Sequence, residues 1–199
     1  MADTLRERRR QLLRDEILDM AEQLMAEKGY AGMSMEELAS YVGVSKPTLY
    51  NQFPAKDDLV RAAAMRAMER LFALLDEPQE ASPLARIVSL LSAVIQLQCE
   101  KGPNTLPLWM PEIIQMLRAR PESKALLQRY DTQLVELVRA AVARGEIAPT
   151  LDTASIVRVF YALICAPTIA RESSSGMPDS ATMANTITMI FLAGVRARP

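Results

Sequence analysis

The stretch SMEELASYVGVSKPTLYNQFPAKDDL, residues 34–59, decides the fold. Ser34 is followed three residues later by Glu37, and this capping box predicts a helix start. Gly43 can take a positive φ at a helix end without steric cost, and Ser45 offers the N-cap of a second helix. We therefore expect two short helices joined by a tight turn. Their predicted bounds are residues 35–41 and 46–52.

The second of these helices has two different faces. Leu49 and Phe53 are four residues apart and would pack inward, while Pro47 is tolerated in the first turn. No acidic residue occurs from Ser40 to Lys56. Because carboxylates there would repel phosphates, this favours nucleic-acid binding over an ordinary helical hairpin without a ligand. The outward side chains are polar: Lys46, Thr48, Tyr50 and Asn51.

Residues 10–60 resemble the DNA-binding domain of the TetR family of one-component transcriptional regulators. The resemblance implies a homodimer with an N-terminal three-helix DNA-binding domain and a helical C-terminal domain that binds a small effector. Beyond residue 60 it extends only to helical layout and an Ala-Arg-Gly-Glu-Ile stretch. The matching residues are Gly29-Tyr30, Ser34-Met35-Glu36-Glu37-Leu38-Ala39, Val42-Gly43-Val44-Ser45-Lys46-Pro47-Thr48-Leu49-Tyr50 and Phe53-Pro54-Ala55-Lys56-Asp57-Asp58-Leu59.

Three places depart from the usual family pattern. Pro47 stands where many members carry Gly, and Ala55 stands where a capping Ser is common. Asn51-Gln52 replaces a frequent aromatic or His pair. These departures bear on base preference and on the start of the next helix, while the expected docking mode is unchanged.

The predicted fold class is all-α. An N-terminal helix-turn-helix domain is expected at 1–55, and a helical effector-binding and dimerisation domain at 56–199. Thr4 and Glu7 predict a capping box for the first helix, which Gly29 should end. The remaining helices follow apolar periodicity and the N-cap, Pro and Gly signals at their ends. Outside the two short helices, the predicted helices are 5–28, 56–75, 83–101, 111–119, 121–144, 153–171 and 180–197.

Composition narrows the classes of function. The chain has 199 residues, half of them apolar, and no histidine. Lack of histidine removes the commonest general base and metal ligand, and no nucleophile–base or phosphate-loop motif is present. We expect no enzyme activity, no metal and no cofactor. With no apolar run long enough for a membrane span and no signal peptide, a cytoplasmic location is expected.

Charge is less uniform than the total suggests. The net charge is −1, which argues mildly against nucleic acid. Residues 1–14, however, hold five arginines against Asp3 and Glu7. These arginines either reach a DNA minor groove or form a solvated helix start. They are Arg6, Arg8, Arg9, Arg10 and Arg14.

Roles in DNA binding follow from residue chemistry and from the resemblance. Tyr50 and Lys56 are expected on phosphates, helped by the helix start at Ser34. Base edges would be met by Lys46, Thr48 and Asn51, since Lys can reach guanine and Asn can pair with adenine. The full predicted DNA-binding set is Ser34, Ser45, Lys46, Pro47, Thr48, Tyr50, Asn51 and Lys56.

The helices between residues 83 and 144 hold the candidate effector site. Mostly apolar walls with a few polar groups are typical of small-molecule pockets, and Met side chains let a pocket adapt. A plain hydrophobic core is the alternative for the same pattern. The expected lining is Leu91, Ile95, Gln98, Cys99, Trp109, Met110, Ile113, Met116, Leu117, Tyr130 and Leu134.

The last two predicted helices are apolar on more than one face, which exceeds the needs of a single packed side. Either they form one deeply buried pair within a monomer, or they form a four-helix interface in a homodimer, as the resemblance implies. The sequence thus predicts a dimeric, ligand-responsive repressor of a DNA operator. A constitutive DNA binder or an activator of the same fold is the alternative. The apolar positions are Ile156, Val157, Phe160, Tyr161, Ile164, Met183, Ile187, Ile190, Phe191 and Val195.

Overall fold

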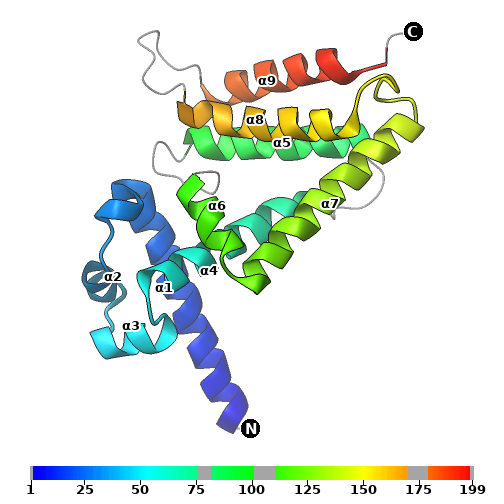
Figure 1. The fold of residues 1–199 in the computed structure, drawn as a ribbon. Coiled ribbons are helices and arrows are strands. Elements are labelled where there is room, and N and C mark those ends of the chain that lie inside the picture. The colour runs from blue at the N-terminus through cyan, green and yellow to red at the C-terminus, as the bar shows by residue number, and fades with distance from the viewer. Residues whose placement is uncertain (1, 76–81, 101–110, 170–178, 198–199) are drawn as a thin grey trace. The chain divides into compact units, whose positions relative to one another are not determined.

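The computed structural model describes residues 2–75, 82–100, 111–169 and 179–197. In these ranges the chain is helical, and an isolated antiparallel bridge joins Ile147 to Arg196 (Figure 1). The predicted all-α class is confirmed. The elements are α1 (Ala2–Gly32), α2 (Met35–Val42), α3 (Lys46–Gln52), α4 (Lys56–Phe72), the 3-10 helix η1 (Ala73–Leu75), α5 (Pro83–Glu100), α6 (Pro111–Arg118), α7 (Pro121–Ala143), α8 (Thr153–Ile169) and α9 (Ser180–Val195).

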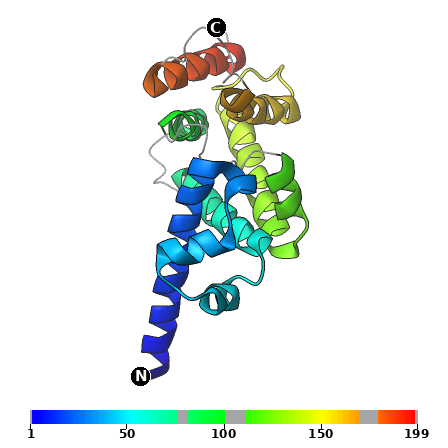
Figure 2. The ribbon, with the colours of Figure 1, turned by 90° about the vertical axis from the view of Figure 1, so that its left-hand side faces the viewer.

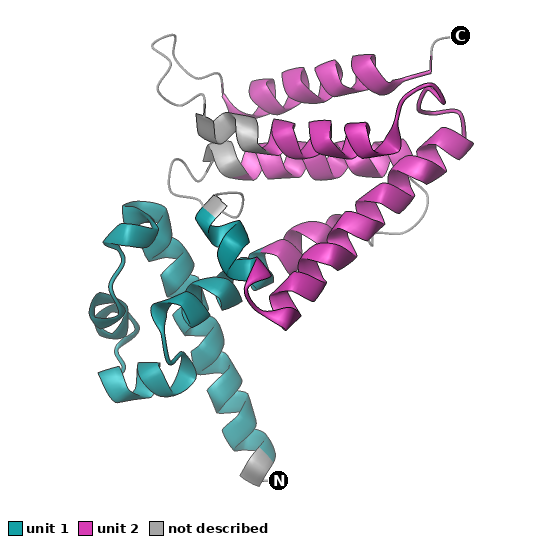
Figure 3. Ribbon diagram, viewed as in Figure 1, with its two compact units in different colours: residues 1–67, 104–117 teal, residues 68–103, 118–199 magenta. Residues whose placement is uncertain are grey.

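The chain divides into two compact units (Figure 3). Unit 1 consists of Met1–Ala67 and Asn104–Leu117, and unit 2 of Met68–Pro103 and Arg118–Pro199. The division falls within α4, so this helix contributes its first part to unit 1 and its end to unit 2. Each unit has its own buried apolar residues.

The first helix is longer than its local signals predict. The capping box at Thr4 and Glu7 is wrong, because α1 already begins at Ala2 and Thr4 lies inside it. The predicted end is confirmed: Gly29 has φ 71° and ψ 173°, and this non-helical residue separates the long helix from a last short turn. The side of α1 that packs inward is an apolar stripe, in which Leu13 is half-buried and the other members are buried: Ile17, Ala21, Leu24 and Met25.

Helix starts in unit 2 follow local hydrogen-bond chemistry. Ser82 Oγ accepts the backbone N–H of Ala85 at 3.2 Å, and Asp152 accepts that of Ser155 at 2.8 Å. Asp179 caps α9 by accepting the N–H of Thr182 at 2.9 Å. Gly145, with φ 70°, follows α7 as predicted. Such caps satisfy N–H groups that lack a partner in the helix.

Unit 2 is built around α5, which packs against α7, α8 and α9 (Figures 1 and 2). Leu90, Leu91 and Val94 of α5 are buried there. Phe72 and Tyr130 stack with ring centroids 3.9 Å apart and nearly parallel planes. Aromatic stacking of this kind adds to the stabilisation from burial.

Candidate DNA-binding interface

Local capping positions α2. The Glu37 N–H donates to Ser34 Oγ at 3.1 Å, as a capping box requires, while the Glu37 carboxylate forms an ion pair with Lys28. At the other end Gly43 has φ 76°, and the N–H of the following residue, Val44, donates to Ala39 O at 3.0 Å. This 6→1 bond is the Schellman arrangement, which needs a left-handed residue and turns the chain sharply. The tight turn predicted between the two short helices is therefore present.

The start of α3 is fixed by Ser45. Its Oγ accepts the Thr48 N–H at 3.2 Å and lies 2.7 Å from the Thr48 hydroxyl oxygen. Pro47 occupies the first turn, where its missing N–H has no helical partner to lose. Leu49 and Phe53 are 0 % and 1 % exposed. These two anchors determine which face of α3 remains in solvent.

The solvent face of α3 is polar. Lys46, Pro47 and Asn51 are exposed, and Tyr50 is 41 % exposed. Thr48 is half-buried, with its hydroxyl beside Ser45. The side of α3 that does not bury Leu49 is therefore covered by exposed, mostly polar side chains. This is the arrangement in which a short helix can enter a major groove.

Lys46 has an acidic neighbour, Glu36, on the preceding helix. Its Nζ lies 3.5 Å from Glu36 Oε1, and both side chains are more than half exposed. An exposed pair of this kind contributes little to stability. A phosphate can therefore compete with Glu36 for the ammonium group. The spacing of ten residues between the two gives no helical-period signal, so only the turn between α2 and α3 reveals the pair.

Lys56 is held by an aromatic ring. Its Nζ lies 4.4 Å from the centroid of Tyr30, and the Tyr30 hydroxyl donates to Asp57 Oδ1 at 2.5 Å. This hydrogen bond raises the pKa of Tyr30, because it favours the protonated phenol next to a carboxylate. Lys56 is half-buried at the first position of α4. Tyr30 is therefore a positioning residue that its place in the sequence, before α2, did not reveal.

Arg14 connects α1 to the end of α3. Its Nη1 donates to the carbonyl of Gln52, the last residue of α3, at 3.4 Å. The guanidinium carbon lies 4.3 Å from the centroid of the Phe53 ring. A cation near the C-terminal end of a helix also interacts favourably with the helix dipole. Of the five N-terminal arginines, Arg14 thus has a structural role within unit 1.

A second arginine joins α1 to α4 on another side. The Arg66 guanidinium is 2.6 Å from Asp19 Oδ1 and 2.8 Å from Glu22 Oε1, and it donates to the Asp15 carbonyl at 3.3 Å. Arg66 is 19 % exposed. These bonds fix the first part of α4, which carries Lys56, against α1.

The predicted effector-site residues are distributed over both units. In unit 2, Leu91, Ile95, Tyr130 and Leu134 are buried. In unit 1, Ile113 and Leu117 of α6 are buried and Met116 is half-buried. Trp109 and Met110 lie outside the described residues, and the side chains of Gln98 and Cys99 are not described. Their contact with an effector stays a prediction.

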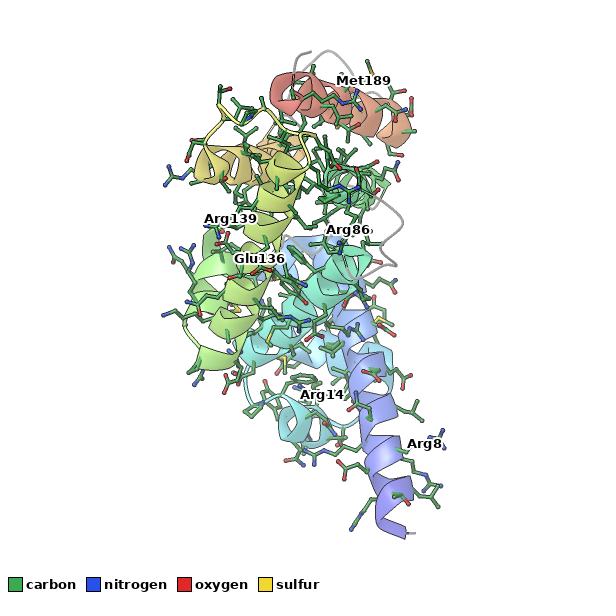
Figure 4. All side chains as sticks on the ribbon, turned by 90° about the vertical axis from the view of Figure 1, so that its right-hand side faces the viewer. Arg8, Arg14, Arg86, Glu136, Arg139 and Met189 are labelled. Carbon is green, nitrogen blue, oxygen red and sulfur yellow. The ribbon has the colours of Figure 1, made fainter. Side chains whose placement is uncertain are left out.

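The α8–α9 pair has apolar side chains on two sides. Four of the predicted positions on α8 are buried, and so are two on α9. Ile190 is 62 % exposed, and two further apolar residues, Met189 and Val159, are 69 % and 49 % exposed. Figure 4 shows Met189 projecting from the outer side of α9. The buried residues are Ile156, Val157, Phe160, Ile164, Phe191 and Val195.

Among the described residues, no cluster of His, Cys, Asp and Glu side chains is suited to hold a metal ion, and no helix is long and apolar enough to cross a membrane.

Comparison with known proteins identifies the domain that contains this interface. Residues 17–63 match the family described as bacterial regulatory proteins, tetR family. The regulator UidR of Escherichia coli K12, an HTH-type transcriptional regulator, is 28 % identical over 173 residues, which cover 81 % of this chain and 86 % of UidR.

Solved structures extend the likeness to nearly the whole chain. A TetR/AcrR-family regulator from Thermobifida fusca is 25 % identical with a TM-score of 0.65, and the match covers 92 % of this chain and 98 % of that one. AibR in complex with isovaleryl coenzyme A and operator DNA is 23 % identical with a TM-score of 0.66, covering 89 % and 97 %. The predicted architecture, a helix-turn-helix domain followed by a helical domain, is confirmed. Residues 17–63 thus form a DNA-binding domain of the tetR family, and the chain has the fold of TetR-family transcriptional regulators.

Proposed function

We propose that this protein is a dimeric transcriptional repressor that binds a palindromic operator through α2 and α3 and is released by a small, largely apolar effector. One observation carries the DNA-binding part. The helix α3 buries Leu49, and Phe53 directly after it is buried as well, while Lys46, Tyr50 and Asn51 remain in solvent. A helix anchored from one side and polar on the other has the form needed for groove recognition.

The contacts divide by chemistry. Tyr50, Lys56 and the helix start at Ser34 would contact phosphates and set the register on the duplex. Lys46 and Asn51 would meet base edges, and the Thr48 methyl group would meet a thymine methyl. Ser45 and Pro47 would contribute to DNA binding by fixing the start of α3. With residues 1–55 as the DNA-binding domain, most of the sequence-specific contacts would come from α3.

The α8–α9 surface supports the proposed dimer. Met189 and Ile190 are large, apolar and mostly exposed, and Val159 of α8 adds to them. Apolar surface of this kind is favourable to bury against a second copy. A symmetric dimer would place two copies of α3 about one DNA turn apart, ~34 Å, and so match a palindrome.

Release requires an effector that binds one dimer state better than the other. Residues 56–199 would form the effector-binding domain, with the predicted lining residues around Trp109. AibR was solved with isovaleryl coenzyme A and operator DNA together, which supports an acyl group as the first effector to try. The protein would act in the cytoplasm, where its operator is accessible.

A gel shift with DNA from the region upstream of its own gene tests the proposal. Wild-type protein should shift the fragment, and Lys46→Ala and Tyr50→Phe should weaken the shift. Asn51→Ala should cost ~1–3 kcal/mol at one base position if Asn51 pairs with adenine. An equal loss on all sequences would make Asn51 a backbone contact, and a wild-type protein that shifts no DNA would refute the proposal.

Effector binding has its own readout, because Trp109 is the single tryptophan. Titration with isovaleryl coenzyme A should change its fluorescence and release the shifted DNA. If a broader panel of acyl and aromatic compounds releases nothing, the protein is a constitutive DNA binder. Transcription that falls on deletion of the protein would indicate an activator.

A further inference from the structure

The N-terminal part of α1 extends beyond the residues that pack in unit 1. Every side chain from Thr4 to Leu12 is exposed, including Leu5 at 62 % and Leu12 at 64 %. Four arginines lie in this part, and among the described residues no ion pair to them is found. Cations near the N-terminal end of a helix gain nothing from its dipole. Their role is therefore not to stabilise α1.

Two of these arginines continue the face of α1 that packs on the rest of unit 1. Arg10 precedes the buried Ile17 by seven residues, and Arg6 precedes Leu13 by seven. Residues seven apart share a helix face. The face that is apolar where α1 is packed thus becomes basic where α1 is free.

The contacts of Arg14 indicate which element lies next to this basic face. It contacts Gln52 and Phe53 at the C-terminal end of α3. Arg10 and Arg6 lie one and two turns further out, at ~6 Å steps along the helix axis. Arg6, Arg10 and Arg14 therefore form a stripe, here called the arginine stripe. It starts beside α3 and leads away from it.

Arg8 is on a different side. It is two residues from both Arg6 and Arg10, which corresponds to about 200° around the helix. Figure 4 shows Arg8 and Arg14 on different sides of α1. Two acidic residues lie close to the stripe by sequence spacing: Asp3 precedes Arg6 by three residues, and Glu7 precedes Arg10 by three, so three arginines stand against two carboxylates.

We propose that Arg6 and Arg10 bind DNA phosphates flanking the sequence that α3 reads, with Arg14 fixing the angle at which the helix leaves the domain. Long guanidinium side chains on a rigid helix can each reach a separate phosphate. Such contacts would lengthen the footprint without adding base specificity. The inference rests on the proposed DNA-binding function.

The test uses full-length protein and a 40-base-pair duplex carrying the sequence that wild-type protein selects from a random library. The double variant R6A/R10A should lower affinity ~10-fold or more at ~0.1 M salt. Its slope of log K against log salt should fall by about two per bound protomer, since each lost phosphate contact removes ~0.9. Hydroxyl-radical protection should disappear at the flanking phosphates and persist at the centre.

A charge-matched control separates contact from overall charge. R8A/R139A also removes two positive charges; Arg139 is exposed on α7 in unit 2. It should keep the wild-type footprint, and R6K/R10K should retain most of the affinity because lysine still binds phosphate. Circular dichroism confirms that each variant folds.

The outcomes are distinguishable. If wild-type protein selects a duplex but R6A/R10A has the slope and footprint of R8A/R139A, the arginine stripe does not bind DNA, and the proposed function stands. If wild-type protein selects no duplex at all, both proposals fail.

Discussion

The solvent faces of α3 and α9 differ in the chemistry that they expose. Both helices bury an apolar side, yet α3 exposes Lys46, Tyr50 and Asn51, whereas α9 exposes Met189 and Ile190. A polar, cationic face suits a hydrated polyanion, because its groups exchange water for phosphate and base contacts. An apolar face gains free energy only when another apolar surface covers it. The comparison predicts one surface for DNA and one for a second subunit.

The largest expected effect tests the anchor of α3. Leu49→Ala should lower the free energy of unfolding by about 2–5 kcal/mol, because a buried side chain is replaced by a cavity. Urea denaturation followed by circular dichroism measures this. Asn51→Ala, an exposed neighbour, should change stability by no more than ~0.5 kcal/mol. Equal effects of the two variants would mean that α3 has no inner and outer side.

A second prediction tests the exposed face of α9. Met189→Asp combined with Ile190→Asp should weaken self-association ~100-fold, about 2.7 kcal/mol, because charges would have to be desolvated in the interface. Analytical ultracentrifugation gives the dissociation constant. Ala125→Glu, at an exposed position of α7, serves as the control and should leave association unchanged. A double variant that still forms a wild-type dimer would place the interface elsewhere.

The cap of α3 should have a smaller effect. Ser45→Ala removes the acceptor of the Thr48 N–H, so we expect a loss of ~1 kcal/mol in unfolding free energy. Ser45→Asp keeps an acceptor and should restore stability, but the added negative charge should weaken DNA binding. Thermal melting and a gel shift on the same samples separate these two effects. Restored DNA binding by Ser45→Asp would argue against phosphates near this helix start.

The smallest predicted effect concerns the pair between α2 and α3. Glu36→Gln removes the partner of Lys46 and one negative charge, so DNA affinity should rise about two- to threefold at low salt and less at high salt. Fluorescence anisotropy at two salt concentrations measures the change. Glu69→Gln is the control, since Glu69 is exposed on α4 and belongs to unit 2. Weaker binding by Glu36→Gln would mean that Glu36 holds Lys46 in its DNA-binding position.

Local chemistry allowed much of the fold to be predicted. The helices at residues 35–42 and 46–52 begin at Ser34 and Ser45, and Gly43 has the positive φ that its position suggested. These features depend on hydrogen bonds between residues three or four apart. Thr4 shows the limit of such signals: a good capping sequence does not start a helix when the preceding residues are helical as well.

The sequence by itself thus determined where the short helices begin and which side of α3 is apolar, because both follow from neighbours within one or two helical turns. Only the tertiary structure decided that the Tyr30 ring contacts the Lys56 ammonium group and that Arg14 donates to the Gln52 carbonyl. It also decided that Arg66 pairs with Glu22 and so joins α4 to α1. The two residues of each pair are separated by 26, 38 and 44 positions in the sequence, respectively. Contacts at that separation depend on how helices pack, and no periodic pattern in the chain encodes them.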